Sequence, residues 1–337
     1  DYTQAIKLNP EFAIAYHNRG NARERQGDYQ GAIADYNQAI QLNPDFAFAY
    51  SNRGNARSEK GDYQGAIADY NQAIQLNPEL ANAYNGRGAA RYHLKDYEGA
   101  IADFTQAIKL NPDYALAYNG RGIARSDLED YQGAIADYNQ AIKLNPEYAN
   151  AYNKRGNARY HLRDYEGAIE DYNQAIKLNP EYANAYNNRG VAHYNLKDYQ
   201  GAIEDYNQAI KLNPEYANAY NNRGNARSDL EDYEGAIEDF NQAIKINPEY
   251  ADAYYNRGIT HYKLKDYQGA IEDYNQAIKL NPDLANVYYH RGHIHRNLGD
   301  KDKALEDFRQ AAELYQQQGN REWYQNAQKK IRELEQE

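Results

Sequence analysis

The chain has 337 residues, with 49 acidic against 38 basic side chains, 37 Tyr, and neither Cys nor Met. The lack of Cys excludes disulfides, thiolate metal ligands and a cysteine nucleophile, and a net charge of −11 argues against non-specific binding to nucleic acid or anionic membranes. No apolar run approaches the roughly 20 residues that a membrane span requires, so we expect no direct membrane insertion. Because the sequence starts at Asp1 without an initiator Met, we expect the natural chain to be longer.

A fixed repeat organises the whole sequence. The nine prolines recur every 34 residues, from Pro10 to Pro282. Such a period marks a protein built of stacked repeats rather than two ordinary domains. Residues 1–12 are predicted to be the C-terminal half of a truncated repeat, and residues 319–337 a C-terminal capping helix. Between them we predict nine repeats: 13–46, 47–80, 81–114, 115–148, 149–182, 183–216, 217–250, 251–284 and 285–318.

Each repeat is predicted to contain two helices and no strand. In the first full repeat these helices cover about 13–26 and 29–42, and Asp28 is placed to cap the second one. The Asn-Pro pair that follows ends the second helix. The last repeat departs from the pattern at Lys301 and Ala312.

The segment after Gly319 carries apolar residues on one helical face. Trp323, Ala327, Ile331 and Leu334 share that face, and the remaining residues are mostly polar. A stacked-repeat protein needs such a closing helix to cover its last apolar face.

The repeat pattern resembles that of the tetratricopeptide repeat (TPR) family. The resemblance rests on Gly20, Ala32, Tyr36, Ala39 and Pro44 and on the equivalent residues of the other copies. It implies an all-α fold, a right-handed α-α superhelical solenoid of helix-turn-helix repeats, whose inner groove holds peptides or partner proteins. The amino-acid sequence of the repeats is also similar to that of TPR arrays common in cyanobacteria.

One departure from the family is a charged residue at the seventh position of each repeat, where the family usually has Leu. Arg occupies this position in all nine copies, and Asp occupies position 23 on the inward side of the second helix. Buried charges need partners, so we predict a structural ladder of inter-helix ion pairs; the alternative is an arginine cluster for an anionic ligand. The residues are Arg19, Arg53, Arg87, Arg121, Arg155, Arg189, Arg223, Arg257 and Arg291 with Asp35, Asp69, Asp103, Asp137, Asp171, Asp205, Asp239, Asp273 and Asp307.

The opposite face of the first helices is rich in Asn. An Asn amide offers both a donor and an acceptor, which matches one peptide unit of an extended chain. The predicted peptide-binding groove contains Asn18, Asn21, Asn52, Asn55, Asn153, Asn157, Asn187, Asn188, Asn221, Asn222, Asn225 and Asn256, with Tyr92, Tyr160, Tyr194 and Tyr262 contacting ligand side chains. In particular, the pairs Asn21/Asn52, Asn157/Asn188 and Asn225/Asn256 resemble the asparagine ladders by which some family members hold a peptide backbone. The alternative is a neutral surface copied by duplication.

No pattern indicates catalysis. The segment with His290, His293 and His295 could supply two metal ligands, but ordinary groove histidines are the favoured interpretation. We therefore predict no cofactor, no metal and no catalytic residue, and a non-enzymatic, cytoplasmic scaffold for an extended peptide or a partner protein. The alternatives are an array that self-associates end to end through its terminal repeats, and the recognition arm of a larger protein with an upstream effector domain.

Overall fold

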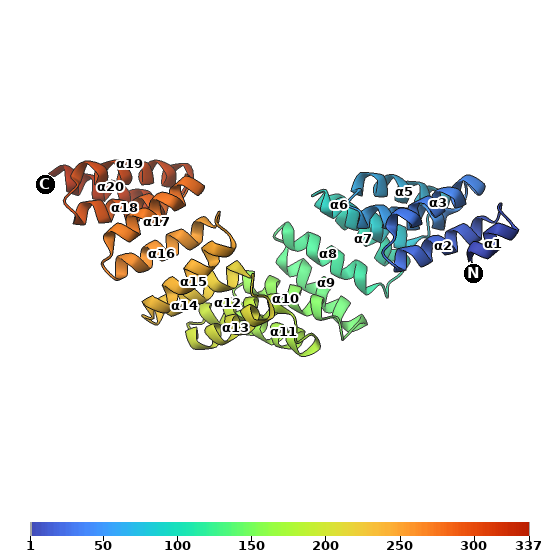
Figure 1. Cartoon of the computed structure of the whole chain (residues 1–337), viewed down its shortest axis with the longest axis horizontal. Coiled ribbons are helices and arrows are strands. Elements are labelled where there is room, and N and C mark those ends of the chain that lie inside the picture. Colours follow the sequence, from blue (N-terminus) through green and yellow to red (C-terminus); the bar gives the residue numbers. More distant parts are fainter. Residues whose placement is uncertain (1, 337) are drawn as a thin grey trace. The chain divides into compact units, whose positions relative to one another are not determined.

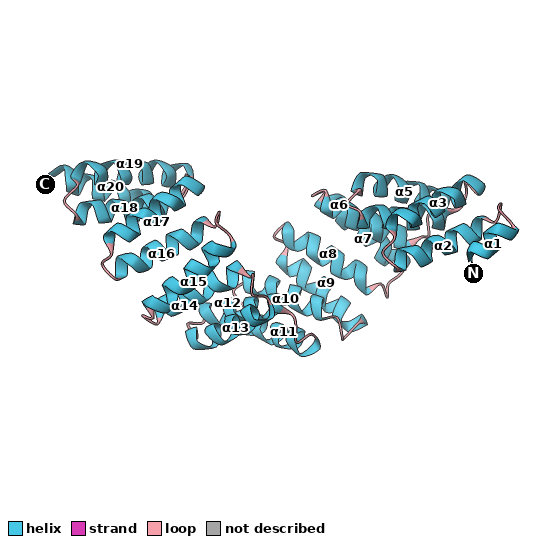
Figure 2. Cartoon of the chain, in the orientation of Figure 1, coloured by secondary structure: helices cyan, strands magenta, loops and turns pink. Residues whose placement is uncertain are grey.

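A computed structural model describes residues 2–336, and every regular element within them is an α-helix (Figure 2). Residues 1 and 337, the outer ends of the predicted half-repeat and cap, lie outside the described residues. The chain divides into two compact units, Asp1–Asn179 and Pro180–Glu337. Figure 1 labels the helices of the chain.

Unit 1 contains α1 (Tyr2–Leu8), α2 (Ala13–Arg25), α3 (Tyr29–Leu42), α4 (Ala47–Glu59), α5 (Tyr63–Leu76), α6 (Ala81–His93), α7 (Tyr97–Leu110), α8 (Ala115–Asp127), α9 (Tyr131–Leu144), α10 (Ala149–His161) and α11 (Tyr165–Leu178). Unit 2 contains α12 (Ala183–Asn195), α13 (Tyr199–Leu212), α14 (Ala217–Asp229), α15 (Tyr233–Ile246), α16 (Ala251–Lys263), α17 (Tyr267–Leu280), α18 (Ala285–Asn297), α19 (Lys301–Gln317) and α20 (Arg321–Gln336).

Local sequence signals set the helix ends. The Asp28 carboxylate accepts a hydrogen bond from the backbone N–H of Gly31 at 2.8 Å, which satisfies one of the free N–H groups at the start of α3. At the other end, the Asn43 side chain accepts from the backbone N–H of Asp45 and so supports the turn before the next repeat. The second helices of the repeats 13–46 to 251–284 match the predicted range, whereas α19 extends to Gln317. The first helices are one residue shorter than predicted; in α2, for example, Gln26 forms the C-cap.

Small residues allow the two helices of a repeat to pack closely. A Cβ built on Gly20 would lie 2.6 Å from the Tyr36 ring, so the tyrosine occupies the space that a side chain would need. Ala32 and Ala39 are fully buried on the same face of α3. The core is therefore a repeated set of tyrosines packed among alanines and glycines.

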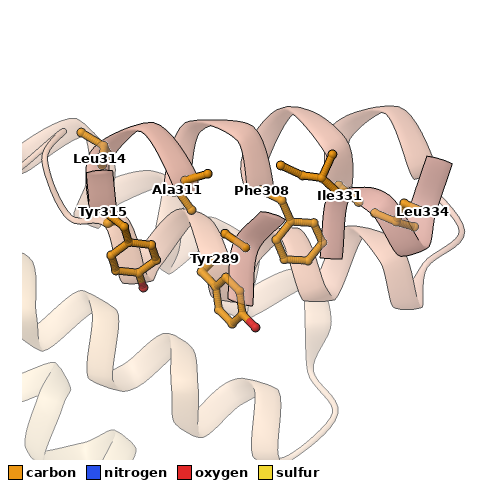
Figure 3. Close-up of a cluster of buried hydrophobic side chains, with 11 residues drawn as sticks. Tyr289, Phe308, Ala311, Leu314, Tyr315, Ile331 and Leu334 are labelled. Carbon is orange, nitrogen blue, oxygen red and sulfur yellow. The ribbon is translucent and has the colours of Figure 1, made fainter. Parts of the chain in front are cut away.

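The C-terminal end of unit 2 is closed by α20. Ile331 and Leu334 of this helix are buried against Phe308 and Ala311 of α19 (Figure 3). Trp323 keeps 39% of its surface exposed, but its ring lies against Tyr289 and Tyr315, with ring centroids 5.4 Å and 5.9 Å away. Among residues 2–336, no helix combines the length and the apolar character needed to cross a membrane.

Candidate functional site

The repeated arginines and aspartates form inter-helix ion pairs. In the third repeat, Arg87 donates through Nε and Nη2 to the two oxygens of Asp103, at 2.9 Å and 2.6 Å. Arg91, one turn further along α6, donates to the same carboxylate at 2.8 Å. Asp103 is only 3% exposed, so two guanidinium groups neutralise a carboxylate that has lost its water.

Each of these arginines has further partners. The Arg87 guanidinium lies over the Tyr84 ring at 5.4 Å and donates through Nη1 to the Asn71 side chain of the preceding repeat at 2.6 Å. The same Arg–Asp pairing recurs 16 residues apart at Arg19–Asp35, Arg53–Asp69, Arg121–Asp137, Arg155–Asp171, Arg189–Asp205, Arg223–Asp239, Arg257–Asp273 and Arg291–Asp307. The donors of these arginines face carboxylates of their own repeat. The arginines therefore hold the two helices of a repeat together and do not form a site for a free anion.

Three repeats of unit 2 carry His in place of the second arginine. His193 lies 2.9 Å from Asp198, while its other ring nitrogen is 3.9 Å from Asp205. The Asp205 carboxylate therefore has one guanidinium partner, Arg189, and burial raises its pKa above the ordinary value.

The predicted groove asparagines lie in two layers. Asn153, Asn187 and Asn221, at the fifth position, are only 3%, 7% and 5% exposed and lie below the groove surface, which corrects their expected placement on it. Asn187 and Asn221 each accept a hydrogen bond from the next repeat, at 3.2 Å from Asn222 and 3.0 Å from Asn256. The deeper amides of unit 2 thus fix the orientation of the shallower ones.

Buried tyrosine hydroxyls hold the asparagines at the ninth position. Tyr70 donates to Asn55 at 2.7 Å and Tyr172 to Asn157 at 2.9 Å, while the Tyr36 hydroxyl lies 2.8 Å from the side-chain oxygen of Asn21. Asn21 accepts a hydrogen bond from Asn52 at 2.9 Å. The predicted pair Asn21/Asn52 is thus in direct contact, whereas Asn157 and Asn188 lie in different units.

The predicted groove tyrosines bridge successive repeats. The Tyr92 hydroxyl donates to Asp127 at 2.6 Å, and the Tyr194 hydroxyl donates to Asp229 at 2.5 Å. Burial is the larger cause that raises the pKa of both phenols, and the hydrogen-bonded carboxylate is the second. The ring of Tyr160 packs against Tyr165, and Tyr262 is 38% exposed. Sequence reasoning missed Asp127 and Asp229 as partners, although each lies 35 residues after its tyrosine.

Two pockets coincide with predicted asparagine pairs. One, between α2 and α4, has a volume of about 450 Å³ and is lined by Asn21, Glu24, Arg25, Tyr29, Asn52 and Glu59. The other, along α12, α14 and α16, has a volume of about 220 Å³ and is lined by Tyr194, Asn225, Ser228, Asp229, Asn256, Ile259 and Lys263.

The histidine segment of α18 is packed among aromatic rings. The His293 ring lies 4.8 Å from Tyr289 and 5.1 Å from Phe308, and burial lowers its pKa to about 4. Burial also lowers the pKa of His290. Within the described part of the chain, no three His, Asp or Glu side chains are grouped so that they could hold a metal ion.

Family models cover nearly all of the chain. A model described as "TPR repeat" matches residues 25–61, 54–95 and 224–265. Three further models are described as "Tetratricopeptide repeat". The first matches residues 119–177 and 153–217, and the second matches residues 81–114, 251–284 and 285–318. The third matches residues 1–34 and 205–238. The chain therefore belongs to the tetratricopeptide repeat family, as the sequence pattern predicted.

Two solved structures share the fold, and a third has a lower similarity. The APC/C hetero-tetramer Cut9–Hcn1 is 15% identical over 99% of this chain and 80% of that chain, with a TM-score of 0.61. A tetratricopeptide repeat protein from Parabacteroides merdae is 19% identical over 74% of this chain and 98% of that one, with a TM-score of 0.57. YrrB, described as a TPR protein with an unusual peptide-binding site, is 24% identical over 55% of this chain and 95% of its own, with a TM-score of 0.47. The comparison with curated proteins found no match.

These findings agree on the class of protein. The consecutive packing of helix pairs and the matched repeat models define an all-α TPR solenoid, a scaffold of the kind that binds proteins and peptides.

Proposed function

We propose that the chain is a non-enzymatic scaffold that holds an extended peptide, or an extended segment of a partner protein, along the first helices of its repeats. The observation that carries this proposal is the coincidence of two pockets with two asparagine pairs that the sequence singles out for peptide binding. Asn21 and Asn52 line one pocket, and Asn225 and Asn256 line the other.

The chemistry of these side chains favours backbone recognition. Each amide presents a donor and an acceptor, so successive amides can pair with the N–H and C=O groups of an extended strand. Oriented side chains bind with less loss of conformational entropy than mobile ones. Asn52 orients Asn21, and the deeper Asn221 orients Asn256. Recognition of the backbone implies modest sequence specificity.

The groove side chains can be tested without disturbing the ion-pair ladder. We would select ligands for the immobilised chain from a random 12-residue peptide display library and measure the affinity of a selected peptide by isothermal titration. Replacing Asn21 and Asn225 by Ala should weaken binding about fivefold for each hydrogen bond that the peptide loses, because one such bond contributes on the order of 1 kcal/mol.

The matched control changes amides elsewhere on the repeats. Gln64→Ala and Gln200→Ala lie on exposed faces of α5 and α13, and together they should leave the affinity unchanged. Equal affinities for the groove double variant and the wild type would contradict the proposed groove. Melting curves followed by circular dichroism would verify that both double variants remain folded.

Self-association is the second candidate function. The described part of α1 contains no buried residue, and Leu8 and Phe12 are 79% and 42% exposed. Such apolar side chains can mediate contact between copies. Light scattering over a range of concentrations tests this candidate, because a mass that stays at 38.7 kDa contradicts it.

A cytoplasmic location belongs to the main proposal and can be tested by fractionating cells that express a tagged chain.

A further inference from the structure

The pocket between α2 and α4 differs in charge from the pocket along α12, α14 and α16. Its lining includes two carboxylates, Glu24 and Glu59, and one guanidinium, Arg25, which gives a formal charge of −1. Neither glutamate forms an ion pair within residues 2–336. In the other pocket, by contrast, Lys263 lies 3.9 Å from Asp229, and the formal charges cancel.

Glu24 is held in place without a cation. One of its oxygens accepts a hydrogen bond at 2.6 Å from the hydroxyl of Tyr36, whose side chain is fully buried. The same hydroxyl lies 2.8 Å from the side-chain oxygen of Asn21, so Asn21 and Glu24 form one connected polar wall. Burial raises the pKa of Glu24, and the negative charge of Glu59 contributes in the same direction, whereas the hydrogen bond from Tyr36 and the charge of Arg25 oppose this rise. A half-buried carboxylate in this position is stabilised by an incoming positive charge.

This arrangement is specific to the first repeat. The residue equivalent to Glu24 is Ser or Tyr in the next seven repeats and Arg296 in the last. The groove carboxylates Asp127 and Asp229 each accept a hydrogen bond from a tyrosine of the preceding repeat, whereas Glu59 has no such hydrogen bond within residues 2–336. The acidic pocket is therefore not a feature copied along the array.

We infer that the α2–α4 pocket binds a basic side chain, Arg or Lys, of the peptide that occupies the groove. The cationic head would lie between Glu24 and Glu59 and donate to these carboxylates and to the side-chain oxygen of Asn52. Tyr29 offers its ring to the aliphatic part of the side chain. One incoming positive charge brings the formal charge of the pocket to zero. This inference rests on the proposed function and adds a side-chain preference to it.

Two blocked nonapeptides that differ in one residue test the inference. They are Ac-Ala-Ser-Ala-Ser-Arg-Ser-Ala-Ser-Ala-NH2 and the same peptide with Gln in place of Arg, titrated into the whole chain at low salt. The Arg peptide should bind about tenfold more tightly than the Gln peptide, and Glu24→Gln with Glu59→Gln should remove this difference. Both substitutions keep the size of the side chain, and the amide oxygen introduced by Glu24→Gln can still accept from the Tyr36 hydroxyl. Melting curves accompany the titrations to show that the double variant is folded.

The matched control removes two groove charges outside the pocket. Asp127→Asn with Asp252→Asn should preserve the preference for Arg. Equal binding of the two peptides to the wild type, or no binding of either, would overturn the inference, as would N-acetylarginine amide binding as tightly as the peptide. Failure of the groove itself would show separately, as unchanged affinity in the Asn21→Ala and Asn225→Ala variant.

Discussion

At the scale of single residues, the ion-pair ladder explains how nine buried aspartates are tolerated. Asp171 is 2% exposed; Arg155 of α10 donates to it, and Arg159 of the same helix forms an ion pair with it at 3.1 Å. The Arg155 guanidinium also lies over the Tyr152 ring at 5.4 Å. Charge neutralisation, saturated hydrogen bonding and ring contact together offset the loss of hydration.

Removing one member of this group should be costly. Arg155→Leu leaves Asp171 with one guanidinium in place of two, and we expect the free energy of unfolding to fall by about 3 kcal/mol. Urea denaturation followed by circular dichroism measures the loss. The control is Arg159→His, which reproduces the His193 arrangement already present in the next repeat, and it should cost less. A wild-type midpoint in the Arg155→Leu variant would refute the buried pair.

The half-buried His293 should make the C-terminal end sensitive to acid. Burial and the nearby charges of Lys330, His290 and Arg296 lower its pKa to about 4 in the folded state, against an ordinary value of 6.5, while Glu333 acts in the opposite direction. Because the unfolded chain takes up this proton first, the stabilisation is present above pH 6.5 and is lost as the pH falls towards 4.

The single tryptophan provides the measurement. Trp323 shares the cluster around Tyr289 and reports unfolding of the C-terminal end by fluorescence. Between pH 6.5 and 4 the wild type should lose more stability than His293→Asn, since Asn occupies the same repeat position at Asn225. Parallel pH profiles would exclude His293 as the cause.

Sequence reasoning predicted some residue contacts and not others. The Arg–Asp pairing was predictable because both residue types occur once per repeat on facing helices. The depth of Asn187 and the bond from Tyr194 to Asp229 were not, because they depend on the side-chain register between adjacent repeats. Helical periodicity specifies the face on which a residue lies, but not how deeply the neighbouring repeat buries it.

At the scale of elements, the turn between the two helices of a repeat is made in two ways. The first two repeats have Gly27 and Gly61 at a positive φ, of 77° and 80°. The next six have Lys, Arg or Glu there, with φ near 63° at Lys95. A side chain in this left-handed region is strained, whereas glycine is not.

Exchange between the two kinds of turn should alter stability. We expect Lys95→Gly to raise the stability of unit 1 by up to about 1 kcal/mol, since relief of the strain exceeds the entropy cost of glycine. The reverse change, Gly61→Lys, should lower it by a similar amount. Thermal melts of the two variants measure both effects, and shifts of the same sign would contradict this account.

The elements themselves were the most predictable part of the structure. The Asp N-caps and the Asn-Pro turns recur in register, so each second helix was located to the residue in the repeats 13–46 to 251–284. The first helices, which lack a side-chain N-cap, were predicted one residue too long. The division of the array at Asn179 was not predicted, because the repeats on its two sides are nearly identical in sequence.

At the scale of the whole molecule, burial is uneven along the array. In the described part of α1 no residue is buried, whereas α20 buries Ala327, Ile331 and Leu334. Local opening is easiest where few apolar groups are buried. We therefore expect the amides of α1 to exchange with deuterium fastest among the helices and those of α3 to be far more protected, as hydrogen-exchange mass spectrometry would show. Equal protection of α1 and α3 would contradict this expectation.

The span of the ion-pair ladder bears on how the array can change in length. Every buried aspartate finds its arginine 16 residues earlier, inside its own 34-residue copy. A gene that gains or loses whole copies by unequal recombination therefore never separates a buried anion from its counter-ion, whereas a break between the arginine and the aspartate of one copy does. The copies at 149–182 and 183–216, which differ at 6 of 34 positions, illustrate this tolerance. In such a lineage the length of the array can be adjusted in whole-copy steps without redesign of the interior.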